Sequence, residues 1–585
     1  MTHGESTVPP ALAQSMVAHA LAMRQRAVAT LPFLLAVSAF HVPGTRLATS
    51  ARKMLQTGSD VAWKEFGALP PGDWRTAEGP ASSVIVGGGP AGMATAIMFA
   101  KRGWRNVVVV DRLRAPPDPG DAAIWGDTAR FYLVGLGARG QRSLAALGAW
   151  DDVERYCAAV VGRKDWAPGA GPDEGAERIF TDRPYTTQVI ARDRLAGALY
   201  RHALATYPDA ISFRHGVDVD DVTESAVVLA TGEELSGDLV VGADGTARTV
   251  AMALEDTGRG TRITRYADDN ERIFKTVPLK LPADWRGDIN YSARSVDGRL
   301  NFDALPAAKG TNEYCAVLLL KADDALARED ADVGELRALL DKELPQFSPH
   351  VDDATLRAVA KKPSSRLPGF RFVGPKLHRG ANVVLLGDAI HTVKPYFGLG
   401  ANAAFEDVAE LDAALSGTAR GSVALAAFSA KRGPEAKALV QISRGLDRPG
   451  VLGFVTFILP IILDSVFHAA LPRVFGPNVI ASLQQDGTFV DVRRRKRRDR
   501  LLQAGVIGSC LAAAGFAAKF AICHALATPL ARKRALVAAG VAALAVAAAK
   551  LRAYLDPALA PADVLTKSKS PVTNSNEDFL AAGSR

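Results

Sequence analysis

The glycine-rich turn after residue 86 constrains this chain more than any other feature. A short β-branched run, 84–86, enters the spacing Gly87-x-Gly89-x-x-Gly92, and a stretch of helical composition follows. In a strand-turn-helix unit, the first glycine allows the tight turn. The second lets a pyrophosphate approach the backbone, and the third lets helix and strand pack closely. The pattern predicts a dinucleotide site in which the N-terminus of the helix faces the phosphates.

A second predicted strand, 107–110, gives this turn its context. It ends in Asp111, 19 residues after Gly92, where an acid can accept hydrogen bonds from ribose hydroxyls. Glycine-rich turns are common, so the prediction depends on the order strand, helix, strand and acid.

Two later apolar strands also end in an acid. Residues 238–245 end in Asp244-Gly245, and residues 382–388 end in Gly387-Asp388. The second strand is followed by Pro395, Gly398, Gly400, Ala401 and Asn402, where a further helix begins. A carboxylate at a strand end can bind sugar or ribityl hydroxyls, and a helix N-terminus can stabilise negative charge on a flavin ring. Three such strand ends in this order predict a flavin nucleotide site.

The third strand end carries the most specific pattern. GDAIHTVKPYFGLGANAAFED, residues 387–407, agrees at every defined position with GDAxHxxxPxxGxGxNxAxED. That pattern is typical of the FAD-dependent aromatic hydroxylases related to p-hydroxybenzoate hydroxylase. The chain resembles this family over about residues 80–530, and within it the kynurenine 3-monooxygenases most. The resemblance implies bound FAD, with NADPH or NADH and dioxygen as co-substrates, and the protein supplies position and electrostatics rather than a catalytic triad.

The resemblance also implies roles for single residues. Asp388 would anchor the ribityl chain, Gly398–Asn402 would lie beside the pyrimidine end of the flavin, and Pro395 and Gly398 would shape the reacting site. The expected cofactor-binding residues are Gly87, Gly89, Gly92, Asp111, Arg139, Arg192, Asp244, Gly387, Asp388, Gly400, Ala401 and Asn402. We expect His391 to be structural rather than an acid or base.

Two departures from the family pattern stand out. The second motif usually continues DGxxSxxR, but here Arg248 replaces the serine and Ala251 the arginine, which affects the usual nicotinamide and pyrophosphate contacts. Of four kynurenine-binding positions, only Arg163 matches, as the residue that would bind a substrate carboxylate. The other three fall near Phe180, Leu446 and Val479, with Tyr185 as the nearest tyrosine to the first.

The predicted fold class is α/β: a Rossmann-like FAD-binding domain with an inserted, mostly antiparallel substrate domain, a C-terminal helical region and a membrane anchor. We assign 80–150, 186–258 and 375–435 to the FAD-binding domain, and 151–185 and 259–374 to the substrate domain. Residues 436–492 form the helical cover, in which 449–463 is an apolar helix over the pocket. Residues 1–79 form a targeting segment and linker, 493–555 a basic block with membrane-anchoring helices, and 556–585 a disordered tail.

Charge and composition limit the partners. The 585 residues are 48% hydrophobic and 23% charged, with a formal net charge of +8. That excess lies in 493–500, which has seven basic residues and one acid, and in 1–58, which has five and one. The remaining body is close to neutral, so we expect no nucleic-acid partner. The four cysteines lie far apart, so we expect neither disulfides nor a metal site.

The two ends indicate an organelle membrane, mitochondrial or plastid. Residues 501–518 are uncharged and marginally long enough to span a bilayer, and 535–549 form a shorter run. One span with an interfacial helix, a hairpin, or a soluble helical pair would each fit. From Met23, two arginines precede an apolar run, which resembles a bipartite plastid presequence. A mitochondrial presequence from Met1, or a helix that packs on the body, is the alternative.

Three functions compete. The first is a membrane-anchored aromatic hydroxylase of the kynurenine 3-monooxygenase type. The second is a flavin epoxidase or hydroxylase of an isoprenoid, such as a carotenoid or quinone, favoured by the apolar C-terminal region. The third is a flavoprotein without turnover that serves as a binding module, which the altered second motif would explain.

Overall fold

The computed structural model describes residues 81–525 except 122–131, 182, 224–225, 259, 418–420 and 486, together with residues 533, 534, 537 and 540. The chain divides into two compact units, Met1–Leu501 and Leu502–Arg585. The predicted targeting segment, the tail and almost all of the apolar run 535–549 lie outside the described residues.

A six-stranded sheet with the order β20-β21-β12-β1-β2-β8 forms the centre of the first unit. Its strands pair in parallel except for β20. The bounds are β1 Ser83–Val86, β2 Val107–Asp111, β8 Ile211–His215, β12 Leu239–Gly242, β20 His378–Arg379 and β21 Val383–Leu385. Their apolar residues are almost all buried, as expected for a parallel sheet covered on both faces. The parallel α/β unit is therefore confirmed.

Helices cover this sheet. α4 (Pro90–Lys101) packs against α7 (Arg192–Thr206) and α11 (Leu399–Ser416), and α11 also contacts α5 (Ala138–Leu147) and α12 (Gly421–Gly445). The shorter helices are α6 Trp150–Glu154 and α8 Thr249–Asp256, with 3₁₀ turns η5 Gly387–Ala389 and η6 Pro395–Phe397. Both α4 and α11 begin at a glycine: α4 follows β1 with Gly89 as its N-cap, and α11 follows η6 with Gly398 as its N-cap.

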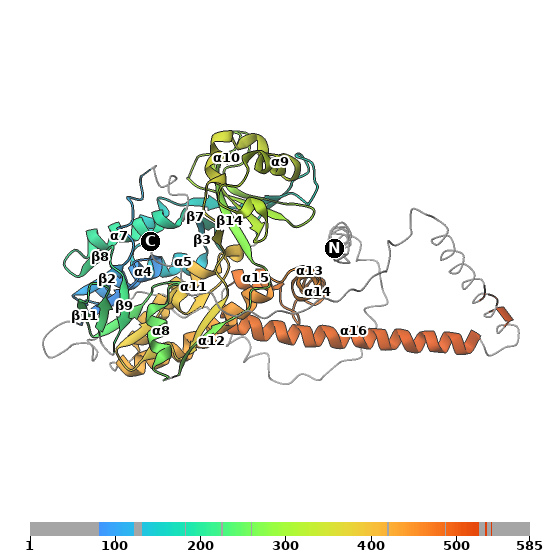
Figure 1. The fold of residues 1–585 in the computed structure, drawn as a ribbon. Helices are drawn as coiled ribbons and strands as arrows, with labels where there is room; N and C mark the ends of the chain where they lie inside the picture. Colours follow the sequence, from blue (N-terminus) through green and yellow to red (C-terminus); the bar gives the residue numbers. More distant parts are fainter. Residues whose placement is uncertain are drawn as a thin grey trace, which may run out of the picture. The chain divides into compact units, whose positions relative to one another are not determined.

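A seven-stranded sheet with the order β18-β14-β17-β16-β15-β5-β6 forms the second layer. Only the β15–β5 pair is parallel, so the predicted antiparallel sheet is confirmed. The bounds are β5 Gly162–Asp165, β6 Ala176–Ile179, β14 Arg272–Lys280, β15 Ile289–Arg294, β16 Leu300–Pro306, β17 Glu313–Lys321 and β18 Ser365–Arg366. Figure 1 shows α9 (Val333–Glu343) and α10 (Asp353–Ala360) over β14. Trp166, Phe302 and Phe347 belong to the core beneath them.

Three small sheets complete the body. They comprise β3 Leu133–Leu136, β4 Ala158–Val160 and β7 Thr187–Ala191; β9 Val219–Val222, β10 Ala226–Leu229 and β11 Glu234–Ser236; and β13 Thr261–Arg265, β19 Arg371–Pro375 and β22 His391–Thr392. Two further 3₁₀ turns are η3 Ala325–Ala327 and η4 Ser348–His350.

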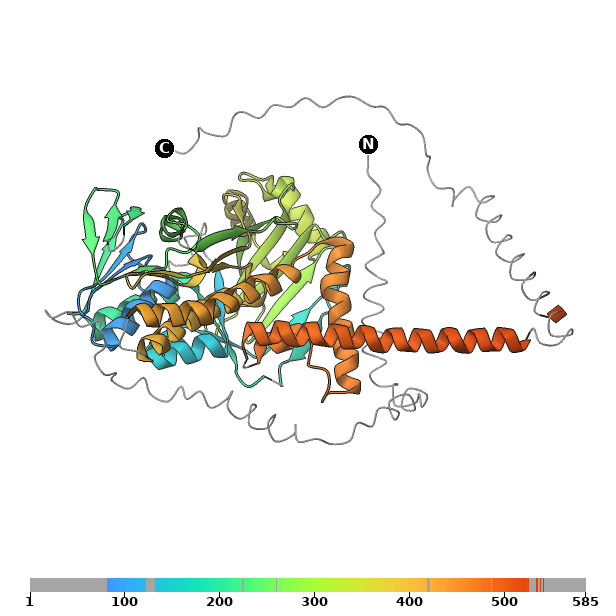
Figure 2. The ribbon, with the colours of Figure 1, turned by 90° about the horizontal axis from the view of Figure 1, so that it is seen from below.

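Long apolar helices follow α12. Residues Gly450–Ala470 form one continuous helical segment made of α13 (Gly450–Gly453), a π-helical turn (Phe454–Ile458) and α14 (Leu459–Ala470). After α15 (Val479–Gln484) comes α16 (Phe489–Ala525), and Figure 2 shows α14 crossing it. Gly450–Ala470 and Phe489–His524 are both long and apolar enough to cross a membrane by length and composition.

Candidate functional site

The first glycine turn is built for close backbone packing on one side and is open on the other. Gly87 has φ +106°, and a Cβ there would lie 2.3 Å from the carbonyl oxygen of Ala243. A Cβ on Gly92 would lie 1.8 Å from the carbonyl oxygen of Gly87, so helix and strand could not pack. A Cβ on Gly89 would meet nothing within 4 Å, and no side chain caps α4, which begins there. An open helix N-terminus of this kind fits a pyrophosphate.

Asp111, at the end of β2, already holds this turn. Its Oδ2 accepts a hydrogen bond from the backbone N–H of Gly88 at 2.6 Å, and its Oδ1 accepts one from Leu113 at 2.7 Å. The carboxylate is therefore fixed beside the glycine turn. Each oxygen retains a further lone pair that could accept a ribose hydroxyl.

Asp244, at the end of β12, is the acid of the second motif. Its Oδ2 accepts a hydrogen bond from the backbone N–H of Val250 at 3.3 Å, whereas its buried Oδ1 has no partner among the described residues. Burial raises the pKa of Asp244 from 3.8 to about 6. A buried acceptor without a donor is rare in native proteins, so this oxygen fits a hydroxyl of a bound nucleotide.

Asp388 lies on η5, directly after β21, and Gly400 of α11 faces it. Burial raises its pKa, and the charges of His391, Arg248 and Arg192 partly oppose that rise. A Cβ on Gly400 would lie 3.9 Å from Asp388 Oδ1, so the first turn of α11 lies beside the carboxylate. A buried carboxylate beside a helix N-terminus fits a polyol chain such as the ribityl group of FAD.

Arg248, which replaces the family's serine, joins the second motif to the third. Its buried guanidinium donates from Nη2 to the carbonyl oxygen of Asp388 at 2.7 Å and to the Thr392 hydroxyl, and from Nη1 to Thr246 at 3.1 Å. Its backbone has φ +61°, which is unusual outside glycine. Burial lowers its pKa to about 10. The sequence revealed the departure but not this bridging contact.

Asn402, on the first turn of α11, holds two loops together. Its Oδ1 accepts hydrogen bonds from the N–H groups of Gly137 at 2.8 Å and Gly140 at 3.2 Å. Its Nδ2 donates to the carbonyl oxygens of Gly135 at 2.8 Å and Gly398 at 2.6 Å. These four bonds use the full capacity of the amide, so the side chain positions the loops and only its backbone is left for a flavin.

The turn that leads into α11 contains Pro395 and Gly398. Pro395 opens η6, and Gly398 ends it with φ +62° and is the N-cap of α11. No side chain caps this helix either, and Gly400 and Ala401 lie in its first turn. The turn therefore presents a second open helix N-terminus next to Asp388.

A cluster of ionisable side chains around Glu406 and Asp407 of α11 includes Arg139 and His391. His391 is fully buried, and its Nε2 lies 2.8 Å from Asp407 Oδ2, which also accepts the N–H of Gly387 at 2.9 Å. Burial alone would raise the pKa of Asp407, but Arg432 and His391 hold it below its ordinary value. Arg139 binds Glu406 at 2.6 Å, and Glu406 also pairs with Arg432 at 3.1 Å. Both Arg139 and His391 thus occupy positions that support the helix.

Arg192 lies at the start of α7, near the third motif. Its Nη1 contacts Asp193 Oδ1 at 3.0 Å, and its backbone N–H donates to the carbonyl oxygen of Tyr132 at 3.1 Å. Its positive charge lowers the pKa of Asp388, against the larger rise that burial causes.

The predicted substrate residues do not all converge. Arg163, on β5, donates from Nε and Nη2 to Asp165 Oδ1 at 2.8 and 2.5 Å, and its side chain is 40% exposed. Tyr185 lies against Gly137, in the loop that Asn402 holds. Leu446 and Val479 pack instead against the core of the FAD-binding sheet. The guanidinium of Arg163 is therefore already paired on the face of the seven-stranded sheet.

Together these features define an oxidoreductase fold that binds a flavin nucleotide at the carboxyl ends of its parallel strands. A family model described as an FAD binding domain matches residues 81–443. The chain belongs to this family of FAD-binding monooxygenases, so the predicted cofactor, enzyme class and family are confirmed. Reduction by NAD(P)H is typical of the family.

Known proteins support this assignment. The chain is 27% identical over 455 residues to the kynurenine 3-monooxygenase of Salinispora arenicola, covering 73% of this chain and 94% of that protein. It is 28% identical over 335 residues to the violacein synthase of Chromobacterium violaceum, covering 56% and 75%. A crystal structure of 2-methyl-3-hydroxypyridine-5-carboxylic acid oxygenase has a TM-score of 0.51 at 20% identity, covering 68% of this chain and all of that one, and it supports the fold.

Proposed function

We propose that the protein hydroxylates a small aromatic substrate with FAD, NAD(P)H and dioxygen, in the manner of the kynurenine 3-monooxygenases. The observation that carries the proposal is the third strand end. There Asp388 lies beside the N-terminus of α11, which no side chain caps and which begins at Gly398, with Gly400 in its first turn. The relatives of that name align over nearly their whole length.

The residues of this chain would bind and orient the reactants. The glycine turn from Gly87 to Gly92 would hold the pyrophosphate, Asp111 and Asp244 would hold hydroxyls, and Asp388 the ribityl chain. The N-terminus of α11, from Gly398 to Asn402, would stabilise negative charge on the flavin, and Pro395 would set the wall beside it. Arg139 and Arg192 would support the cofactor from α5 and α7. Bound FAD supplies the redox chemistry with NAD(P)H and dioxygen.

The domain division remains part of the proposal. The segments 80–150, 186–258 and 375–435 contain all three strand ends, and β5 and β6, within 151–185, join the sheet formed by 259–374. This supports a substrate site between the seven-stranded sheet and the turn from Pro395 to Gly398, which we call the flavin turn. Kynurenine, the finer proposal for the substrate, would place its carboxylate at Arg163, where it would compete with Asp165.

An isoprenoid substrate is a second candidate. The observation that favours it is the apolar segment Gly450–Ala470, whose Phe457 ring lies 6.3 Å from the ring of Phe397 in the flavin turn. An apolar wall of this kind suits a hydrocarbon substrate better than an amino acid.

Membrane anchoring through the apolar part of α16 is also proposed. Residues 504–524 are exposed apart from one partly buried position, and they belong to a helix with a window of mean hydropathy 1.8. A mitochondrial or plastid membrane is the proposed location, and it depends on a targeting segment within 1–79, outside the described residues.

A substrate panel on detergent-solubilised protein tests the function. We expect at least one aromatic compound to stimulate NAD(P)H oxidation and to yield a product heavier by one oxygen atom. Stimulation only by isoprenoids would favour the second candidate, and the absence of any stimulated oxidation would favour a binding module.

We expect the purified Asp388→Ala variant to lack the absorbance of bound flavin. Full FAD occupancy in that variant would contradict the role of the third motif.

A further inference from the structure

The apolar segment Gly450–Ala470 has the reverse of the polarity expected for a helix on a globular surface. Val455 is 51% exposed and Val466 54%, whereas its one charged residue, Asp464, is fully buried. Its most apolar stretch of 18 residues has a mean hydropathy of 2.1, and only 11% of that stretch is buried. In water, an amphipathic helix turns its apolar face inward and its charges outward.

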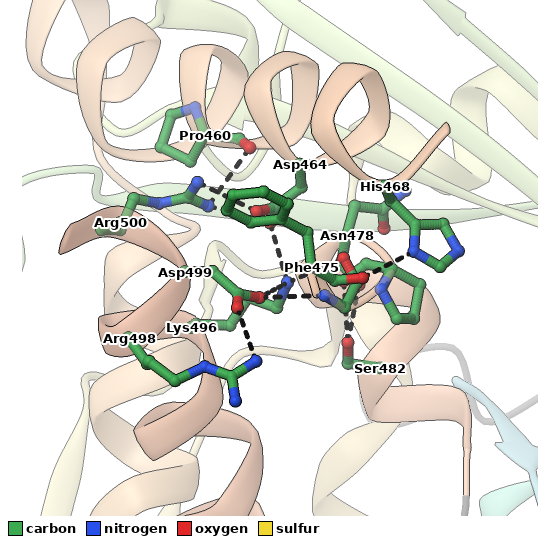
Figure 3. Close-up of polar contacts among 12 residues, drawn as sticks. Pro460, Asp464, His468, Phe475, Asn478, Ser482, Lys496, Arg498, Asp499 and Arg500 are labelled. Atoms are coloured by element: carbon green, nitrogen blue, oxygen red, sulfur yellow. Dashed lines mark hydrogen bonds and ion pairs between the residues drawn. The ribbon is translucent and has the colours of Figure 1, made fainter. Parts of the chain in front are cut away.

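Asp464 points to the basic start of α16, as Figure 3 shows. Arg500 binds it in a bidentate manner, from Nη1 to Oδ1 at 2.9 Å and from Nη2 to Oδ2 at 2.8 Å. Lys496 lies 3.2 Å from Asp464 and 3.0 Å from Asp499, which is also fully buried. Arg498 also lies 3.4 Å from Asp499, so the two buried acids face three basic side chains and both carboxylates are paired.

We propose that Gly450–Ala470 is a lipid-facing helix that lies against a bilayer, in addition to the proposed anchor in α16. Charges that face the protein interior and apolar side chains that face outward are typical of helices in contact with lipid. The exposed arginines of α16 favour anionic headgroups over a protein partner, because they immediately precede its apolar stretch. They are Arg494, Arg495, Arg497 and Arg498.

Lipid-attached quenchers test this in the full-length protein. An environment-sensitive fluorophore is placed on Val455→Cys or Val466→Cys, in a background where the exposed Cys510 and Cys523 are serine. The matched controls are Val296→Cys and Val423→Cys, because these valines are 53% and 49% exposed but lie far from this segment in the sequence. The vesicles contain phosphatidylcholine and phosphatidylserine with nitroxide-labelled chains.

We expect quenching at positions 455 and 466 and none at 296 and 423. Equal quenching at all four positions would overturn the proposal. The absence of quenching at 455 and 466 would also overturn it, and this is the result expected if a second copy of the chain covers the helix. FAD content and NADPH oxidation, measured on the same samples, report separately on the proposed function.

A second observation concerns Lys394, the residue before Pro395. Its ammonium group is buried and donates to Asp268 Oδ1 at 2.8 Å and to the carbonyl oxygen of Asn270 at 2.6 Å, and it lies 2.7 Å from Asp447 Oδ2. All three ammonium hydrogens are thus used. Asp447 lies between α12 and Gly450, so this contact ties the flavin turn to the start of the apolar segment.

The structure assigns Lys394 as a positioning residue for the turn from Pro395 to Gly398, acting with Asp447. This rests on the proposed place of the flavin at that turn. Because the proline fixes its own φ, an anchored residue before it fixes the direction in which the turn begins. The same contact joins the turn to the lipid-facing helix.

Variants separate positioning from general stability. Lys394→Met should raise the dissociation constant of FAD on the order of tenfold and shift the flavin reduction potential, as loss of a supporting residue does elsewhere. Lys275→Met is the matched control. Lys275 is equally buried and donates to the carbonyl oxygens of Arg328 and Ala360, within the seven-stranded sheet and its helices. It should lower the melting temperature and leave FAD affinity unchanged.

The double variant Lys394→Met/Asp447→Asn removes the charge of Lys394 and that of the more buried of its two acidic partners, so it should recover part of the lost melting temperature. We expect its FAD affinity to stay low, because the turn remains unanchored. Recovery of FAD affinity together with stability, or unchanged FAD binding in Lys394→Met, would overturn the assignment. If the wild-type protein binds no FAD, the proposed function fails instead.

Discussion

At the scale of single residues, Asp244 shows how a buried acid can destabilise the folded protein. The unpartnered Oδ1 and the raised pKa have one cause, the burial of the carboxylate at the end of β12. The unfolded chain releases the proton near pH 3.8 and the folded apoprotein near pH 6. Above pH 6 the folded state therefore holds a charge that the unfolded state holds at lower cost.

Asp244→Asn should stabilise the apoprotein at pH 7.5. A shift of about two units corresponds to roughly 2–3 kcal/mol, an upper range because the carboxylate is partly solvated. The gain should shrink as the pH falls through 6 and approach zero only below pH 3.8, where Asp244 is mostly protonated in both states. Thermal unfolding of the wild type and the variant at pH 4.5, 6 and 7.5 measures it. A gain that does not change with pH would contradict this explanation.

At the scale of elements, Asn402 links α11 to the loop before α5. The backbone groups that it satisfies belong to four glycines, three around the start of α5 and Gly398 before α11, so this side chain helps to set how α5 and α11 pack. A substitution leaves several part-buried backbone groups without partners, and each such group costs about 1–3 kcal/mol.

Asn402→Ala should therefore lower the free energy of unfolding by about 2–4 kcal/mol and weaken FAD binding. Asn402→Asp is the informative control, because it keeps the acceptor for Gly137 and Gly140 and loses the donors to Gly135 and Gly398. We expect its loss to be intermediate. Denaturant unfolding and FAD titration measure both effects. An alanine variant as stable as the wild type would show that the loops hold each other without Asn402.

Local patterns predicted the elements of this fold well, because their causes are local. The β-branched runs and glycine spacings gave β1, α4, β21 and α11, and each glycine acts through its own backbone. What the sequence could not provide were contacts between distant side chains. Arg248 reaches Asp388 across 140 positions, and the basic block joins Asp464 across more than 30. Such pairs depend on how the sheets and helices pack, which no local period encodes.

The basic block is an example of this limit. From the sequence, 493–500 is a charged flank of a membrane span. In the structure, Lys496 and Arg500 turn inward to Asp464 while the exposed arginines turn outward. Residues four apart lie on the same face of a helix, so the sequence could predict that Lys496 and Arg500 face the same way. It could not predict that their acidic partner is Asp464 of α14.

At the scale of the whole molecule, this contact decides where the protein can be shortened. Truncation after Val492 removes Lys496 and Arg500 and so breaks the ion pairs of the fully buried Asp464, which costs about 3–5 kcal/mol. We expect that form to aggregate. Truncation after residue 504 keeps these ion pairs and removes most of the apolar part of α16.

The form truncated after residue 504 should fold and bind FAD. It should also be released from membranes more easily than the full chain. Carbonate and high-salt extraction, compared with detergent, measures the release. The full-length protein should need detergent. Its extraction by salt or carbonate alone would contradict the anchor in α16.

The last prediction concerns the substrate class. If the substrate carries a carboxylate, Arg163 should bind it, because a planar guanidinium can form two charge-assisted bonds. Its partner Asp165 and its 40% exposure reduce the expected effect below that of a buried pair. Arg163→Ala should raise the half-saturating substrate concentration about tenfold with FAD still bound, and Arg163→Lys should restore little of the lost affinity.

Arg286→Ala is the matched control, since Arg286 is 42% exposed and paired with Asp288 near the same sheet. The Arg286→Ala variant should have the same half-saturating substrate concentration as the wild type. An isoprenoid offers no carboxylate, so its turnover should be the same in all three variants. Equal half-saturation in wild type and Arg163→Ala would therefore remove the amino-acid substrate and favour the apolar one, for which Gly450–Ala470 is the proposed wall.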